Sequence, residues 1–134
     1  MIKHIITHYP SYIIESFKEY HDNILIREEN YHEDGNLHGR YYMDSGKRIL
    51  ECEYLNGKLN GKYKSFSYYK KETVECIYID GMIHGTYYFY VKEGLYKTYE
   101  YLNGKLHGME KTYDPWLNKL IYENENENGF IKLR

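Results

Sequence analysis

The sequence predicts an all-β protein, an elongated single-layer antiparallel meander of stacked β-hairpins. Three observations predict this fold. A Gly-x-x-x-Gly pattern occurs four times with a period of about 23 residues, which is typical of a repeat architecture. Each first glycine follows Asn or Asp, and these dipeptides are the strongest short signal for a two-residue hairpin turn. Tyrosine and leucine alternate with polar residues on either side of the turns, as expected of strands with one apolar face.

The paired glycines are expected to be structural, with one of each pair in the turn and the other in the strand that leaves it. They are Gly35 and Gly39, Gly57 and Gly61, Gly81 and Gly85, and Gly104 and Gly108. Because the pattern fills most of the chain, residues 1–134 are interpreted as one domain. Its predicted parts are an N-terminal cap and partial repeat (1–30), four repeats (31–123) and a C-terminal partial repeat or cap (124–134).

The flanks and the opposite ends of the hairpins carry weaker turn signals. Asp22-Asn23 precedes a strand-like segment in the N-terminal part, and Asn128-Gly129 suggests a fifth, truncated turn. A turn at Ser45-Gly46 is expected to join the first two repeats. The remaining far turns, near 68–72, 91–93 and 114–116, vary in length and are expected to absorb bulges.

Counting outward from each two-residue turn predicts which residues face one another. The pairs nearest the turns are Tyr54–Leu59, Tyr78–Ile83 and Tyr101–Leu106, with Tyr31–Leu37 restored by a three-residue loop Glu33-Asp34-Gly35. The next pairs are Cys52–Gly61, Cys76–Gly85 and Tyr99–Gly108, followed by Leu50–Tyr63 and Val74–Tyr87. The turn at Ser45-Gly46 adds Gly39–Cys52 and Tyr41–Leu50. We therefore expect the second glycine to leave space that neighbouring tyrosine rings fill.

This register gives the sheet two different faces. The apolar face is the candidate interaction surface, and its tyrosines are Tyr41, Tyr54, Tyr63, Tyr78, Tyr87 and Tyr101. The reverse face is predicted to carry a row of alternating charge, Arg40, Glu51, Lys62 and Glu75. Two readings of the tyrosine surface stay open, since the rings could cover one another or could contact another protein.

The segments "YLNGKLNGKY", "YIDGMIHGTY" and "YLNGKLHGME" resemble MORN (membrane occupation and recognition nexus) repeats. They are most similar to the Tyr-x-Asn-Gly-Lys-Leu-His-Gly variant of bacterial antitoxin-like proteins and large DNA viruses. The resemblance covers about 31–122, with departures at Glu33, Asn60 and Glu110. It implies an elongated sheet of stacked hairpins used for scaffolding, self-association or partner docking, and it implies no catalytic residues.

Composition narrows the functional classes. The formal net charge of −2 provides no basic field for nucleic acid, so no nucleic-acid partner is expected. No apolar run approaches the length of a membrane span, and the first residues do not resemble a signal peptide, so we expect a cytoplasmic location. The chain lacks Ala and Gln, as an AT-rich coding genome would produce, and a viral gene would place it in the host cytoplasm.

No cofactor, metal or small-molecule substrate is expected. His38, His84 and His107 lie before second glycines, and equivalent positions two strands apart, roughly 9.6 Å, are too distant to share one Zn²⁺. The same separation keeps Cys52 and Cys76 from forming a disulfide, so both are interpreted as reduced and partly buried. His4 and His8 show metal-like spacing but have no further ligands.

The leading hypothesis is a non-enzymatic scaffold that binds a protein, including a second copy of itself, through the tyrosine surface or an edge strand. One alternative is peripheral binding to phosphoinositide membranes, which the resemblance implies and which rests on Lys62, Lys64, Lys70 and Lys71. The other is an antitoxin-like inhibitor of a partner protein, which rests on the resemblance alone.

Overall fold

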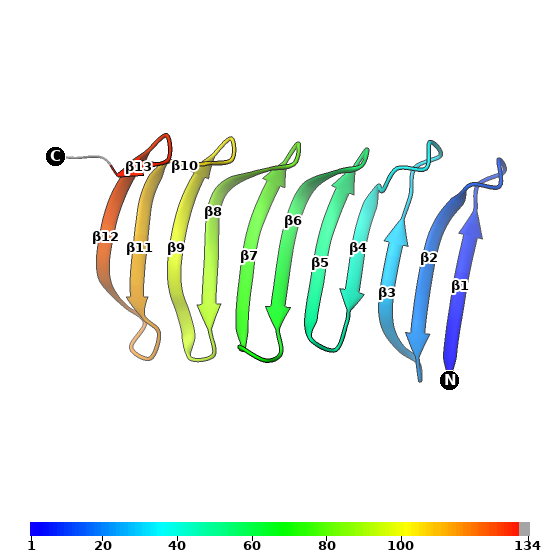
Figure 1. Cartoon of the computed structure of the whole chain (residues 1–134), viewed down its shortest axis with the longest axis horizontal. Coiled ribbons are helices and arrows are strands. Elements are labelled where there is room, and N and C mark those ends of the chain that lie inside the picture. Colours follow the sequence, from blue (N-terminus) through cyan, green and yellow to red (C-terminus); the bar gives the residue numbers. More distant parts are fainter. Residues whose placement is uncertain (132–134) are drawn as a thin grey trace.

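Residues 1–131 are described by a computed structural model, and they form one open antiparallel sheet of thirteen strands with no helix. Figure 1 shows the strands lying side by side along the long axis of the molecule, with the two chain ends at opposite ends of the sheet. Twelve strands follow one another in chain order, and β10 pairs with β9 outside this path. The predicted fold class, an elongated antiparallel meander of hairpins, is therefore confirmed.

The strands are β1 (Ile2–His8), β2 (Ile14–His21), β3 (Ile24–Asn30), β4 (Gly39–Asp44), β5 (Arg48–Leu55), β6 (Lys58–Ser67), β7 (Glu72–Ile79), β8 (Met82–Val91), β9 (Gly94–Leu102), β10 (Lys105–Leu106), β11 (Gly108–Asp114), β12 (Lys119–Glu127) and β13 (Phe130–Ile131). The predicted C-terminal partial repeat, 124–134, extends outside the described residues at 132–134.

The Asn-Gly and Asp-Gly turns all lie at the same end of the strands, the upper end in Figure 1. Asn56 and Gly57 have φ of 49° and 81°, as a type I′ turn requires, and Leu55 pairs with Lys58 across them. The same positive angles occur at the turns after β7, β9 and β12. The predicted fifth turn at Asn128-Gly129 is therefore present, as is the longer first loop, where Tyr31 bridges Leu37.

One backbone hydrogen bond links each of these turns to the hairpin before it. The N–H of the first glycine donates to the carbonyl oxygen of a Leu or Ile three residues after the preceding turn's Asn or Asp. The four bonds are Gly57 to Leu37 (2.8 Å), Gly81 to Leu59 (2.8 Å), Gly104 to Ile83 (2.9 Å) and Gly129 to Leu106 (2.7 Å). We call this series the turn ladder. Each bond links a turn to the hairpin before it. It also pairs a turn N–H that would otherwise lack a backbone acceptor.

The predicted register is correct beside the turns and wrong farther away. Tyr54 faces Leu59 as predicted, but Cys52 faces Tyr63, because three residues of β6 (60–62) lie opposite the single residue Glu53 of β5. Gly61 lies inside this irregularity with φ of 114°, a backbone angle that only glycine adopts readily. The main role of the second glycine is therefore to adopt this positive φ, which bends the strand.

Equivalent register shifts make the other predicted pairs wrong as well. Val74 faces Phe89 and Leu50 faces Ser65, not Tyr87 and Tyr63. In the β9–β11 pair, Thr98 faces Lys111, so the predicted Tyr99–Gly108 pair is also wrong. The predicted Cys76–Gly85 pair fails for the same reason, because the ladder passes from Ile77–His84 to Glu75–Tyr88.

The far turn between β4 and β5 lies one residue later than predicted. The N–H of Ser45 donates to the carbonyl oxygen of Arg48 (3.0 Å), so the two central residues are Gly46 and Lys47. Gly46, with φ of 79°, takes the first central position, as in a type II′ turn. The register moves by two residues, so Tyr41 faces Cys52 and the predicted face is retained.

Alanine substitution separates the two requirements at the second glycine. A Cβ on Gly61 would clash with Glu53 Oε2, whereas a Cβ on Gly85, which also has positive φ, would meet open space. We expect Gly85→Ala to lower the free energy of unfolding by roughly 1–2 kcal/mol through backbone strain alone. Gly61→Ala should lower it further, because Glu53 must also move.

Urea denaturation followed by circular dichroism would measure both values. An equal or larger loss for Gly85→Ala would contradict this account of the Glu53 contact.

Candidate functional site

The candidate site is the tyrosine face, defined by the six tyrosines predicted from the sequence, Tyr41, Tyr54, Tyr63, Tyr78, Tyr87 and Tyr101. Strand pairing places Tyr41, Cys52, Tyr63 and Cys76 in one row across β4 to β7. Tyr87 faces Tyr99, and the other three tyrosines lie opposite second glycines of the preceding hairpin. These pairs are Gly39–Tyr54, Gly61–Tyr78 and Gly85–Tyr101. The prediction that tyrosine rings fill the space beside the second glycines is wrong. A Cβ built on Gly61 or Gly108 would meet Glu53 or Glu100, and one on Gly85 would meet open space.

Ring contacts join these residues in pairs. Tyr41 and Tyr54 have ring centroids 5.8 Å apart, and Tyr63 and Tyr78 are 5.3 Å apart. Tyr87 contacts both Tyr101 at 6.1 Å and Tyr99 at 5.8 Å. Tilted and edge-on pairs of this kind each contribute about 0.5–1.5 kcal/mol beyond the area that they bury. The rings remain half-buried, so they stabilise the sheet and still present a surface to solvent.

The centre of the face is shallowly hollowed. Its lining comes mainly from four successive strands, β6 to β9, and consists mostly of tyrosine with aliphatic and small side chains. The hollow is lined by Tyr63, Ser65, Val74, Tyr78, Ile83, Tyr87, Tyr99 and Tyr101, together with Arg48 of β5. Lys97 lies beside it, with Nζ 6.0 Å from the Tyr99 ring centroid. The surface therefore combines aromatic area with two cations at its border.

Burial changes the acidity of the groups under this face. It raises the pKa of Tyr78 to about 12 and the pKa values of Cys52 and Cys76 to about 11. Both cysteines are free, as predicted, and are only 1% and 6% exposed. Because the thiolate is the nucleophile, these thiols are poorly suited to catalysis near neutral pH and pack as small apolar groups.

The tyrosine face continues toward the N-terminus as a charged cluster, which the sequence patterns did not reveal. Buried Glu29 accepts hydrogen bonds from Arg27 and from the hydroxyl of Tyr31. Burial and the hydrogen bond to Glu29 raise the pKa of Tyr31 to about 12. Strand pairing could not indicate this contact, because Arg27 and Glu29 lie two residues apart on the same strand.

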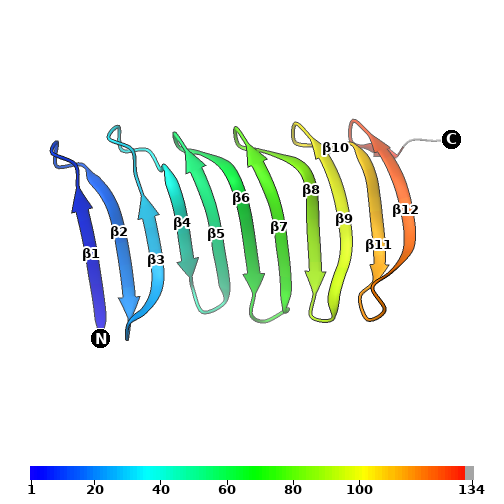
Figure 2. The same cartoon turned by 180° about the vertical axis from the view of Figure 1, so that it is seen from behind.

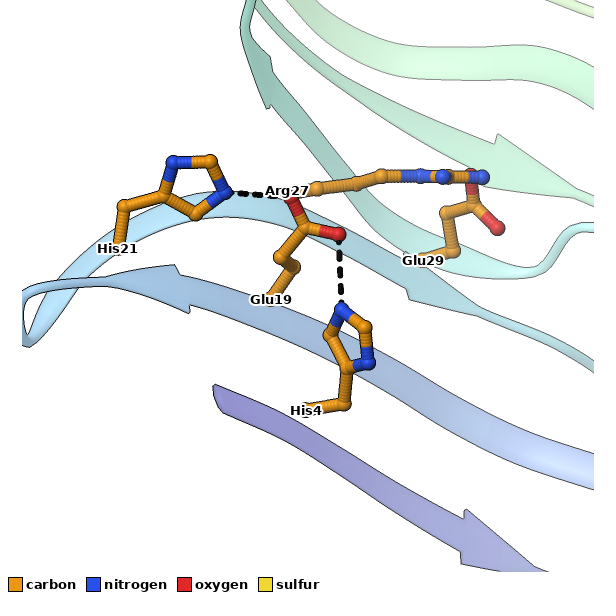
Figure 3. Close-up of polar contacts among 5 residues, drawn as sticks. All are labelled: His4, Glu19, His21, Arg27 and Glu29. Carbon is orange, nitrogen blue, oxygen red and sulfur yellow. Dashed lines mark hydrogen bonds and ion pairs between the residues drawn. The ribbon is translucent and has the colours of Figure 1, made fainter. Parts of the chain in front are cut away.

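Glu19 forms the outer part of that cluster. Figure 3 shows its carboxylate between two imidazoles, with His21 Nε2 at 2.8 Å and His4 Nε2 at 3.0 Å. The hydrogen bonds from His21 and His4 lower the pKa of Glu19. His4 and His8 lie on strand β1, so their spacing is not that of a helix. Among residues 1–131, no group of three or more His, Cys, Asp or Glu side chains could hold a metal ion.

One histidine beside a second glycine, His38, has a structural role. His38 Nδ1 accepts a hydrogen bond from the N–H of Asn56, the first residue of the next turn, at 3.3 Å. Asn60 occupies the equivalent position, and its Oδ1 accepts from the N–H of Asp80 at 3.1 Å. Both side chains offer an acceptor at the same distance from the backbone, which explains why Asn can stand where other repeats have His. A side-chain acceptor recurs just before the second glycine, and this sequence pattern could have predicted the contact with the next turn.

The reverse face differs from the predicted charge row at two residues, because Tyr42 and Lys64 face Glu51 where Arg40 and Lys62 were predicted. Glu51 faces Lys64, which faces Glu75, while Lys62 faces Ile77. Lys64 forms an ion pair with Glu75 at 3.4 Å, and Arg40 contacts both Glu28 and Glu51. The two differences follow from the shifted turn between β4 and β5 and from the register shift at Gly61.

The four lysines considered for lipid binding lie in two places. Lys62 and Lys64 are on β6, and Lys64 is paired with Glu75. Lys70 and Lys71 lie in the far turn, where Lys71 Nζ is 5.9 Å from the Phe66 ring centroid. The structure therefore does not gather these lysines into one patch on the tyrosine face. In residues 1–131 there is also no helix long and apolar enough to cross a membrane.

Comparison with known proteins adds no relative. No protein-family model matches this chain, and a search of curated proteins finds no similar sequence. The fold therefore defines the class of structure, an open meander of β-hairpins, and the resemblance to MORN repeats stays a prediction from the repeated motif.

The raised pKa values predict loss of stability in alkali. In the unfolded chain Cys52 and Cys76 ionise near pH 9.0 and Tyr78 near 10.0, whereas in the fold they ionise near 11 and 12. Their contribution is complete below the unfolded values and is lost as pH rises through the folded ones. We expect the free energy of unfolding to fall between about pH 9 and 12.

Urea unfolding at several pH values would measure this decrease, with tyrosinate absorbance recorded in parallel. Tyr78→Phe is the control, and it should decline less between pH 10 and 12. A folded protein in which all the tyrosines titrate near pH 10 would contradict the prediction.

Proposed function

We propose that this chain is a non-enzymatic scaffold that binds another protein through the tyrosine face. One observation carries the proposal: six half-buried tyrosines share one face of the sheet, and no second layer from residues 1–131 covers it. A tyrosine ring offers a large contact area with few rotatable bonds, and its hydroxyl can hydrogen-bond a partner.

The chemistry of the face restricts the partner. The hollow offers tyrosine rings and hydroxyls with Val74 and Ile83, and the cations of Arg48 and Lys97 attract carboxylates. A partner segment with apolar anchors flanked by Asp or Glu fits this arrangement best. The raised pKa values of the two cysteine thiols favour binding over nucleophilic catalysis by them. Lipid binding and antitoxin-like inhibition stay predictions, because no contact favours either.

Two neighbouring tyrosines on β8 provide a matched test. Tyr87 lies in the hollow, whereas Tyr88 pairs with Glu75 and Thr98 on the reverse face. Affinity purification from cells of the natural source, followed by mass spectrometry, should recover a partner with the wild-type chain and with Tyr88→Thr. Tyr87→Thr should lose that partner by at least tenfold, which corresponds to about 1.4 kcal/mol of binding free energy.

Circular dichroism would establish that both variants are folded. Retention of the partner by Tyr87→Thr, or its loss from Tyr88→Thr alone, would contradict docking on the tyrosine face.

A further inference from the structure

Strand β1 is a free edge of the sheet. Within residues 1–131 it pairs with β2 alone, and all seven of its residues are exposed. Ile2, Ile5 and Ile6 are 62%, 39% and 45% exposed, so the strand offers aliphatic side chains as well as backbone groups. Figure 2 shows β1 at the opposite end of the sheet from β12. An exposed edge of this kind can pair with another strand.

Known hydrogen bonds show which backbone groups of β1 are free. The N–H of Asp22 donates to the carbonyl oxygen of Met1 (2.9 Å), so the backbone groups of Met1 point toward β2. In an antiparallel strand the N–H and C=O of one residue point the same way, and the direction alternates along the chain. Ile2, His4 and Ile6 therefore direct both groups away from β2, to the open edge.

The opposite edge of the sheet is protected in two ways. Asn126 and Glu127 of β12 already pair with Ile131 and Phe130 of β13. The exposed part of β12 carries Glu123, and two copies paired antiparallel there would bring acidic side chains near one another. Strand β1 contains no carboxylate, and its single permanent charge is Lys3. Strand β1 can therefore pair with a strand of a second copy, whereas β12 disfavours such pairing.

We propose that β1 pairs with β1 of a second copy of this chain, forming a symmetric antiparallel dimer. Overlap of the full strand places Ile5 opposite Ile5 at the two-fold axis, Lys3 opposite Thr7, and His4 opposite Ile6. This register brings the outward backbone groups of His4 and Ile6 together and keeps the two Lys3 ammonium groups apart. Shifting by one residue would pair outward with inward groups, and shifting by two would shorten the overlap.

The dimer would join two sheets edge to edge. A two-fold axis perpendicular to the sheet keeps both tyrosine faces on the same side, so one particle would present two docking surfaces. Strand β1 carries none of the six tyrosines. The dimer is therefore independent of protein docking on the tyrosine face, and either proposal can fail alone.

Proline substitution tests the edge without breaking the fold. The N–H of Ile6 points to the open edge, so Ile6→Pro removes a bond that only the dimer makes and leaves the β1–β2 ladder intact. The matched control is Glu123→Pro. Glu127 flanks the two-residue turn and faces β13, so Glu123, four residues earlier, also points outward.

Sedimentation equilibrium over a concentration series would give the particle mass. We expect twice the chain mass for the wild type and for Glu123→Pro, and a single chain mass for Ile6→Pro. A monomeric wild type, a dimer dissociated by Glu123→Pro instead, or growth into larger head-to-tail assemblies would overturn the proposal.

A charge pair tests the register itself. Ile5→Lys places two ammonium groups at the two-fold axis, and Ile5→Glu places two carboxylates there. Each variant alone should be monomeric, and an equimolar mixture should recover the dimer mass, with circular dichroism reporting that all species are folded. A mixture that stays monomeric would overturn this pairing, even if the wild type is a dimer.

Discussion

The structure depends on the turn ladder, because a single-layer sheet has no second layer to hold its strands together. Each tight turn donates the N–H of its glycine to the hairpin before it, from Gly57 through Gly129. The donor is available only because the Asn-Gly or Asp-Gly turn directs that N–H away from its own hairpin. Two side-chain acceptors add to this series: His38 accepts a hydrogen bond from the N–H of Asn56, and Asn60 accepts one from the N–H of Asp80. The Asn-Gly or Asp-Gly turn therefore reverses the chain and also links successive hairpins by a hydrogen bond.

The tyrosine face follows from the same geometry. The positive φ of the second glycine bends the outgoing strand, which adds residues on that side and moves the register by two. Because the shift is even, apolar residues stay on one face, and Tyr63 comes to lie between Cys52 and Cys76. The rings then cover the cysteines in place of a second layer. The aromatic surface is thus part of the fold and also the part left available for a partner.

The ends of the sheet show how an open meander meets solvent. At one end, β13 and the acidic residues of β12 protect the edge. At the other end, β1 is uncovered, although His4 and the Glu19 carboxylate tie it to β2. This asymmetry gives the molecule a direction that its repeated hairpins do not have by themselves. Self-association and docking on the tyrosine face can therefore occupy different surfaces.

The sequence by itself determined the fold class, the turn positions at one edge, the free cysteines and the face of each tyrosine. These depend on local signals and on the strict two-residue alternation of a strand. Only the tertiary structure decided the pairing beyond each turn, because a positive-φ glycine inserts residues without changing the alternation pattern. It also decided the contacts of Glu53 with the strand after Gly61 and of Glu29 with Arg27 and Tyr31. Such contacts depend on how far a side chain reaches across a bent strand. The spacing of residues in the sequence does not indicate this reach.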